Sequence, residues 1–172
     1  MRFAKIERTD GGYFLDPRPY LAHLVEIRDQ LPAGAAAFAE DPGHYDFAST
    51  KCVKDLTLAN MALRDGVGRI TVELQFAPNK FKHDSGLRIR YENAIVFSVN
   101  ADAEGRNEFA WPDTHRLGDL QLDEIIPHEQ GCSHEIAMTG GSIRVIASDL
   151  HAEWCDNGDG TAANRESDDL GA

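Results

Sequence analysis

Alternation of apolar and polar residues is the feature that most limits how this chain can fold. In RITVELQF, residues 69–76, every second side chain is apolar. The same period of two recurs across residues 86–99, where Asn93 marks a bend. Period two is typical of a strand with one buried face. The chain from about residue 52 onward therefore predicts a β-rich domain.

Three further segments extend this pattern. VKDLTLANMALR, residues 53–64, predicts a strand with a phase slip beside Asn60, and a helix is the alternative there. LGDLQLDEII, residues 117–126, predicts a strand of weaker pattern. In SHEIAMTGGSIRVIAS, residues 133–148, two alternating runs flank the Gly-Gly dipeptide at 140–141. Such a dipeptide is typical of a two-residue hairpin loop.

Helical periodicity is confined to the N-terminal part. Asp16 is expected as the N-cap with Pro17 at the first helical position, and apolar residues recur at helical spacing until Pro32 and Gly34 end the helix. A second short helix is expected at 35–40. The fold class is then α+β: an N-terminal helix followed by a mostly antiparallel β-sheet, folded as a sandwich or half-barrel.

Length and composition predict one domain with a tail. A hydrophobic fraction of 42% suits a buried core over residues 1–155, whereas residues 156–172 hold five acids and one arginine and are expected to be a disordered acidic tail. No apolar run approaches the roughly 18 residues of a membrane span, and the N-terminus lacks a secretory h-region. The three cysteines form no CxxC pair, which favours free thiols and a cytoplasmic protein.

The charge of the chain limits its partners. Its 29 acidic residues outnumber 17 basic ones, for a net charge of −12. Nucleic acids and anionic lipids call for the opposite sign. The charge therefore predicts no nucleic-acid or membrane partner, and it favours a basic protein partner. A carboxylate-rich surface that only keeps the protein soluble is the alternative.

The stretch PHEQGCSHE, residues 127–135, gathers several reactive side chains. With Gly140 and Gly141 as the hairpin loop, His134 lies in the apolar row opposite Ala147, and Glu135 lies on the other face, diagonal to Arg144. Because neighbouring strand residues point to opposite faces, His134 and Glu135 cannot serve one site.

A metal site in the same stretch is one hypothesis. Pro127 and Gly131 predict a connecting loop that carries His128 and Glu129. Zinc accepts mixed nitrogen and sulfur ligands, so His128, Cys132 and His134 are the candidate ligands. The alternative is a core histidine, bonded to a backbone carbonyl, beside a small buried thiol.

Other candidates belong to an acid/base or nucleophilic site. Cys52 is flanked by Lys51 and Lys54, which would lower a thiol pKa, and His44 would be its base. Simple packing of Cys52 at a strand start is the alternative. The candidate catalytic residues are His44, Cys52, His83, His128 and His134.

One basic spot interrupts the acidic chain. The loop 78–86 carries Lys82, and Arg88 and Arg90 follow on the polar face of the next strand. These three residues are candidates for binding an anion or an acidic loop. A solvated face balanced by nearby glutamates is the alternative.

Three long stretches resemble a known family: HYDFASTKCVKDL, KHDSGLRIRYENAIVFSV and LDEIIPHEQGCSHEIAMTGGSIRVIASDLHAEW. They are similar to small uncharacterised bacterial proteins, some of which are regarded as immunity-type proteins of toxin systems. The resemblance covers residues 44–154 and carries no catalytic motif. It implies a compact acidic domain that acts by occluding a partner.

These observations lead to three hypotheses about function. The first is a non-enzymatic protein-binding module, an immunity-like inhibitor of a basic partner, with interface loops at 101–108 and 119–124 and with Trp111 and Trp154 as anchors. The second is a small metal-assisted or acid/base enzyme with its site in the concave face of the sheet. The third is a pocket protein without chemistry. The chain has no nucleotide-binding glycine motif, and no cofactor is expected. For the third hypothesis, a ligand-binding pocket without chemistry, the residues expected to line the cavity are Tyr91, Phe97 and Trp111.

Overall fold

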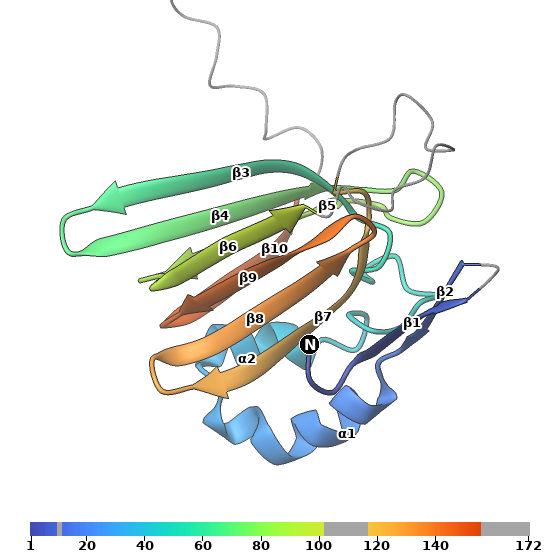
Figure 1. Ribbon diagram of the computed structural model, residues 1–172, viewed down its shortest axis with the longest axis horizontal. Helices are drawn as coiled ribbons and strands as arrows, with labels where there is room; N and C mark the ends of the chain where they lie inside the picture. The colour runs from blue at the N-terminus through green and yellow to red at the C-terminus, as the bar shows by residue number, and fades with distance from the viewer. Residues whose placement is uncertain (10–11, 102–116, 156–172) are drawn as a thin grey trace, which may run out of the picture.

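The computed structural model describes residues 1–9, 12–101 and 117–155 (Figure 1). The predicted tail at 156–172 and Trp111 lie outside these residues. The N-terminal part comprises β1 (Lys5–Thr9), β2 (Gly12–Asp16), α1 (Arg18–Ile27), a 3-10 turn (Arg28–Gln30) and α2 (Ala33–Ala39). The strands that follow are β3 (Thr57–Gly66), β4 (Arg69–Ala77), β5 (Gly86–Glu92), β6 (Val96–Ala101), β7 (Leu120–His128), β8 (Gly131–Met138), β9 (Gly141–Ala147) and β10 (Asp149–Cys155).

The predicted α+β class with antiparallel sheets is confirmed. Strands β10-β5-β4-β3 form one four-stranded sheet and β6-β9-β8-β7 form another, while β1 and β2 pair separately. The pairings between these described strands are antiparallel. The β1–β2 hairpin was not predicted, and it precedes the helix expected at the N-terminus.

Two bends carry the chain from one sheet into the other. Asn93, at the predicted bend, has φ 49° and separates β5 from β6. Ser148 separates β9 from β10, and its amide donates to the carbonyl of Glu92 at 2.9 Å. At the far side, Thr57 forms a bridge with Asp119, so the start of β3 lies against the start of β7. The two sheets are therefore linked at more than one side.

Helices α1 and α2 cover separate strands. The Tyr20 hydroxyl of α1 donates to the carbonyl of Ile125 in β7 at 2.7 Å. The first amides of α2, from Gly34 and Ala35, donate to the carboxylate of Asp149 in β10. This carboxylate satisfies the helix start, where amides lack helical acceptors. The buried residues of α1 are Tyr20, Leu24 and Ile27.

The expected start of α1 was wrong by one residue. Pro17 is the N-cap and has no side chain able to cap, while Asp16 ends β2. Asp16 still supports the helix start, because its carboxylate accepts the Arg18 amide at 3.1 Å. The second predicted helix is confirmed as α2.

The β8–β9 hairpin keeps the predicted faces but not the predicted register. Thr139 and Gly140 form the loop, and Gly141 already belongs to β9. His134 is therefore opposite Val145, and Glu135 is directly opposite Arg144. The shift of two residues preserves every face, because side chains alternate with period two. Gly141 is needed for close packing and not for the turn, because a Cβ there would lie 2.0 Å from the Asn100 carbonyl oxygen of β6.

Two other predictions concern strand bounds. The segment at 57–66 is a strand, with a register shift between Leu58 and Asn60, so the helical alternative was wrong and the phase slip is confirmed. The loop predicted at 127–131 is shorter than expected: β7 runs through Pro127 to His128 and β8 begins at Gly131, so only residues 129–130, including Glu129, connect the two strands. Pro127 is tolerated because β7 is the last strand of its sheet, where a missing amide breaks no ladder.

Candidate functional site

A buried polar network lies at the centre of the molecule and is built around Asp123 of β7. His134 of β8 places Nε2 2.8 Å from Oδ2 of Asp123. His44 places Nε2 2.8 Å from Oδ1 of the same carboxylate. The Tyr91 hydroxyl of β5 lies 2.7 Å from His134 Nδ1. All four side chains are at most 1% exposed.

Each ring nitrogen of the two histidines has a hydrogen-bond partner. His44 Nδ1 lies 2.9 Å from the carbonyl oxygen of Phe38, which can only accept a hydrogen bond, so Nδ1 donates. Nε2 of His44 and Nε2 of His134 both face the Asp123 carboxylate, and His134 Nδ1 shares a hydrogen bond with the Tyr91 hydroxyl.

Burial and neighbouring charge act in opposite directions on these groups. Burial alone would raise the pKa of Asp123, but the charge of His44 and hydrogen bonds from His134 and His44 outweigh it and hold that pKa well below its usual range. Burial, followed by the charge of Asp123, raises the pKa of Tyr91. Asp123 is therefore ionised and Tyr91 is protonated at neutral pH.

This network joins elements that are distant in the chain. His44 ties the segment after α2 to β7, while His134 and Tyr91 tie β8 and β5 to the same carboxylate. The ring of Tyr45 stacks on that of His44 with centroids 4.0 Å apart. Because these groups are buried, the network holds these segments of the chain together from within the core.

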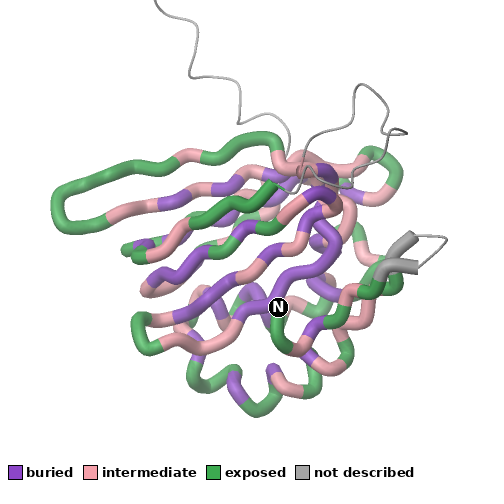
Figure 2. Tube along the Cα trace, viewed as in Figure 1, coloured by how far each residue is buried: buried purple, intermediate pink, exposed green. Residues whose placement is uncertain are grey.

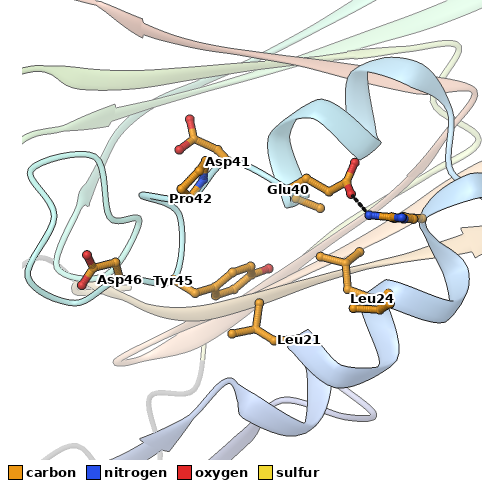
Figure 3. Close-up of a pocket in the computed structure, with 10 residues that line it drawn as sticks. Leu21, Leu24, Glu40, Asp41, Pro42, Tyr45 and Asp46 are labelled. Atoms are coloured by element: carbon orange, nitrogen blue, oxygen red, sulfur yellow. Dashed lines mark hydrogen bonds and ion pairs between the residues drawn. The ribbon is translucent and has the colours of Figure 1, made fainter.

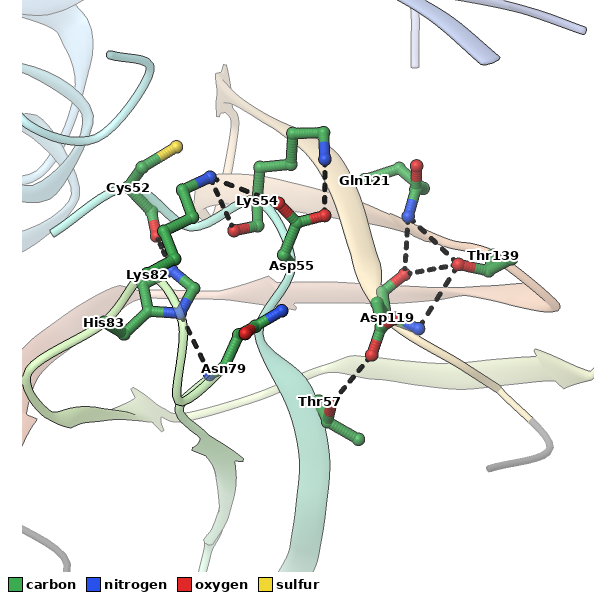
Figure 4. Close-up of polar contacts among 10 residues, drawn as sticks. All are labelled: Cys52, Lys54, Asp55, Thr57, Asn79, Lys82, His83, Asp119, Gln121 and Thr139. Carbon is green, nitrogen blue, oxygen red and sulfur yellow. Dashed lines mark hydrogen bonds and ion pairs between the residues drawn. The ribbon is translucent and has the colours of Figure 1, made fainter. Parts of the chain in front are cut away.

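Cys52 and His83, two other catalytic candidates, meet outside this network (Figure 4). His83 Nε2 donates to the Cys52 carbonyl oxygen at 2.8 Å, and Nδ1 accepts from the Asn79 amide at 3.0 Å. Burial raises the pKa of the Cys52 thiol and lowers the pKa of His83. Both changes favour the neutral forms, so this pair holds the 78–85 loop against the turn at 52.

Two of the three basic candidates, Lys82 and Arg88, make ion pairs. Lys82 Nζ lies 3.3 Å from Oδ2 of Asp55, which also contacts Lys54 (Figure 4). Burial would raise the pKa of Asp55, but the hydrogen bond and charge of Lys54, then Lys82, lower it. Arg88 lies 3.9 Å from a carboxylate oxygen of Glu73 and 3.9 Å from one of Glu153, and Arg90 is exposed on β5.

The candidate metal ligands are not brought together. His128 ends β7, where its Nδ1 accepts the Gln130 amide at 3.1 Å. His134 is committed to Asp123 and Tyr91, while Cys132 is buried opposite Ala147. Among the described residues, no group of three or more His, Cys, Asp or Glu side chains is arranged to hold a metal ion.

Thiol reactivity tests this placement of the cysteines. Burial, followed by the charge of Asp149, raises the pKa of Cys132 to about 12, and Cys52 is also buried. Cys155 is partly exposed. A disulfide reagent should therefore titrate one thiol quickly in the native protein and all three after unfolding, because the thiolate is the reacting species. Rapid reaction of Cys52 or Cys132 in folded protein would contradict this placement.

The expected interface loops need correction. Residues 119–124 lie largely in β7, and Asp123 and Glu124 are buried instead of forming an acidic loop. The Glu124 carboxylate accepts the amides of residues 2–4 at 2.7–2.8 Å. Trp154 is half-buried in β10, with its ring stacked near His83. Residues 102–108 are outside the described chain, as is Trp111.

A pocket that was not predicted opens between α1 and the segment after α2 (Figure 3). Its volume is about 430 Å³, within the range of roughly 300–1,000 Å³ that ligand sites occupy. Leu21 and Leu24 of α1 face Tyr45 across it (Figure 3). The complete lining is Leu21, Leu24, Val25, Arg28, Ala39, Glu40, Asp41, Pro42, Tyr45 and Asp46.

Leu24, Ala39 and Tyr45 of the lining are buried, whereas Glu40 and Asp46 are exposed, so the pocket has an apolar base and an acidic rim. Three carboxylates, from Glu40, Asp41 and Asp46, line it against one cation, Arg28. Arg28 lies 3.2 Å from Glu40, so two carboxylates remain without a counter-charge in the lining. Val25 at the same pocket is 67% exposed, which extends the apolar surface outward.

Similarity to known proteins does not assign this site. Comparisons with protein-family models, with curated proteins and with solved structures found no match. As for membranes, none of the helices in the described ranges is long and apolar enough to span one. The residues of the pocket and of the network are thus the basis for inferring a function.

Proposed function

We propose that this protein is a non-enzymatic protein-binding module whose pocket between α1 and residues 39–46 takes an apolar and basic element of a protein partner. The observation that carries the proposal is the apolar base of that pocket with its excess of carboxylates. Carboxylates at a rim attract cationic partners and select against anionic ones. The net charge of −12 acts in the same direction at longer range.

Burial of the candidate catalytic side chains supports a binding role over an acid/base enzyme. A general acid or base must reach the proton that it transfers. His44 and His134 are sealed in the core and each of their ring nitrogens already has a partner. The network instead preorganises the pocket, because it fixes the position of Tyr45, whose ring stacks on His44.

We also propose that the two sheets form a half-barrel. The bends at Asn93 and Ser148 support this arrangement, because strands that bend between sheets allow a sheet to curl. The Thr57–Asp119 bridge supports it from the opposite side, with the Thr57 hydroxyl donating to the Asp119 carboxylate at 2.7 Å (Figure 4).

The biological role that we favour is that of a cytoplasmic bacterial protein of the immunity type, which occludes a basic toxin domain.

A peptide of alternating leucine and lysine is the probe for the pocket, with a leucine–glutamate peptide as its counterpart. The lysine peptide should bind and lose affinity as salt rises, whereas the glutamate peptide should not bind. Asp41→Asn with Asp46→Asn should weaken binding at least about tenfold, or about 1.4 kcal/mol. Asparagine retains the oxygen that accepts the Gly43 and Ala48 amides, so the turns are preserved.

A matched control separates the pocket from general charge attraction. Asp84→Asn with Glu129→Gln removes the same charge at exposed positions elsewhere, and it should leave affinity within about twofold of the original. Equal losses in the two double variants, or binding indifferent to salt, would overturn the proposal. The protein encoded beside this gene is the first natural partner to test by the same calorimetric titration.

A further inference from the structure

Strand β3 leaves an unusually open sheet edge. It is the terminal strand of β10-β5-β4-β3 and the longest strand of the described chain, at ten residues. Figure 1 shows the β3–β4 hairpin projecting from the body, and Figure 2 shows β3 exposed along most of its length. Beyond the Thr57–Asp119 bridge, no described strand pairs with the outer side of β3.

Two of the other sheet-terminal strands are covered within the described residues. Strand β10 carries α2, whose first amides bond to Asp149. Strand β7 is contacted by α1 and by residues 2–4, which bond to Glu124. Strand β6 is the other terminal strand, and it has six residues against ten in β3. Among the terminal strands of the two four-stranded sheets, and within the described residues, β3 therefore offers the longest uncovered set of backbone donors and acceptors.

The side chains of β3 offer only part of the protection found at natural sheet edges. Its sequence, TLANMALRDG, contains no proline and no lysine, and its register shift lies at the first residues only. Met61 and Leu63 are 40% and 52% exposed. They pair with Leu74 and Val72, which are fully buried, so the apolar face of the sheet continues outward to an exposed edge.

The strand is also complementary to itself. An antiparallel pair of β3 strands centred on Ala62 places Met61 of each copy opposite Leu63 of the other. The apolar faces of the two strands then lie on the same side of the joined sheet, as the period of two requires. Residues 57–66 contain one arginine and one aspartate, so the edge is neutral on a chain with a net charge of −12. Two copies can approach there with less repulsion than elsewhere.

We propose that β3 is the interface for a second copy of this chain, joined edge to edge in an antiparallel, two-fold arrangement centred on Ala62. The β10-β5-β4-β3 sheet of one copy and the same sheet of the other copy then form one continuous eight-stranded sheet across the dimer. This interface is independent of the pocket between α1 and residues 39–46, so either proposal can fail without the other.

A cysteine on the two-fold axis tests the register. Ala62→Cys, in a Cys155→Ser background, places two thiols on directly opposed residues, whose Cα atoms lie about 4.5–5.5 Å apart. This separation is within the range of disulfides. Mild oxidation should convert most of the protein to a covalent dimer. Val67→Cys in the same background is the control, because in this register residue 67 is far from its own copy, and it should form no covalent dimer under the same oxidation.

Association without a cross-link is measured by sedimentation over a range of concentrations. The unchanged protein should show a monomer–dimer equilibrium, and Leu63→Lys should weaken it at least about tenfold because a charge would face Met61. Val67→Lys adds the same charge at a fully exposed turn position and should have no effect. Circular dichroism checks that each variant is folded. A monomer at all concentrations, or a dimer insensitive to Leu63→Lys, overturns the proposal.

Discussion

Replacing Asp123 with asparagine should lower the free energy of unfolding by about 3–5 kcal/mol. The substitution keeps the shape of the side chain but removes the buried negative charge that His44 and His134 both contact. The amide would also point a donor toward His44 or His134, both of which donate to this position. Urea unfolding followed by circular dichroism gives the free energy directly.

The matched control is Asp84→Asn, an exposed position where the same change should cost less than about 0.5 kcal/mol. Combining Asp123→Asn with His44→Gln removes two groups that contact each other and should recover part of the loss, since each is costly to bury mainly when the other is absent. If Asp123→Asn costs no more than Asp84→Asn, the network does not stabilise the fold.

Acid unfolding provides a second readout of the same group. Because the folded-state pKa of Asp123 lies below its ordinary value of about 3.9, the unfolded chain binds more protons between those two pKa values. The stabilisation is therefore fully present above about pH 4 and is lost as the pH falls toward the folded-state pKa. The Asp123→Asn protein should show a shallower decline over that window.

His134 could be placed from sequence, whereas its partner could not. Simple alternation from Leu120 puts Asp123 on the opposite face, toward solvent. The strand contains a register shift between Leu120 and Leu122, which returns Asp123 to the core face beside Ile125. An acid between apolar residues of one strand was the available signal, but the irregularity that turns it inward is decided by pairing with β8.

The pocket and the hairpin loop were missed for related reasons. The pocket forms where α1 meets residues 39–46, and their relative position depends on the bond between His44 and Asp123, 79 residues away. The hairpin loop moved by one residue, and the strand pairing by two, because Gly141 is needed where β6 passes closely, a contact that local sequence does not reveal. The apolar–polar period and the turn residues predict which face of a strand each side chain occupies. Contacts between distant parts of the chain decide the register of strand pairing and the position of cavities.

Replacing Gly34 with alanine should destabilise the protein by about 3 kcal/mol or more, although alanine is the better helix former. In a helix interior alanine gains about 1 kcal/mol over glycine. A Cβ at Gly34, however, would lie 1.9 Å from the Leu150 carbonyl oxygen, a backbone atom of β10 that cannot rotate away. Helix α2 would have to withdraw, which would break the bonds from Gly34 and Ala35 to Asp149.

The same substitution at Gly66 provides the control for Gly34→Ala. A Cβ there would meet the Arg69 carbonyl oxygen at 3.4 Å, which is an ordinary contact, and the change should stay within about 0.5 kcal/mol. Thermal and urea unfolding of the two variants distinguish crowding from helix propensity, because the two effects have opposite signs at Gly34. Stabilisation by Gly34→Ala would mean that α2 does not pack on β10 as closely as these distances require.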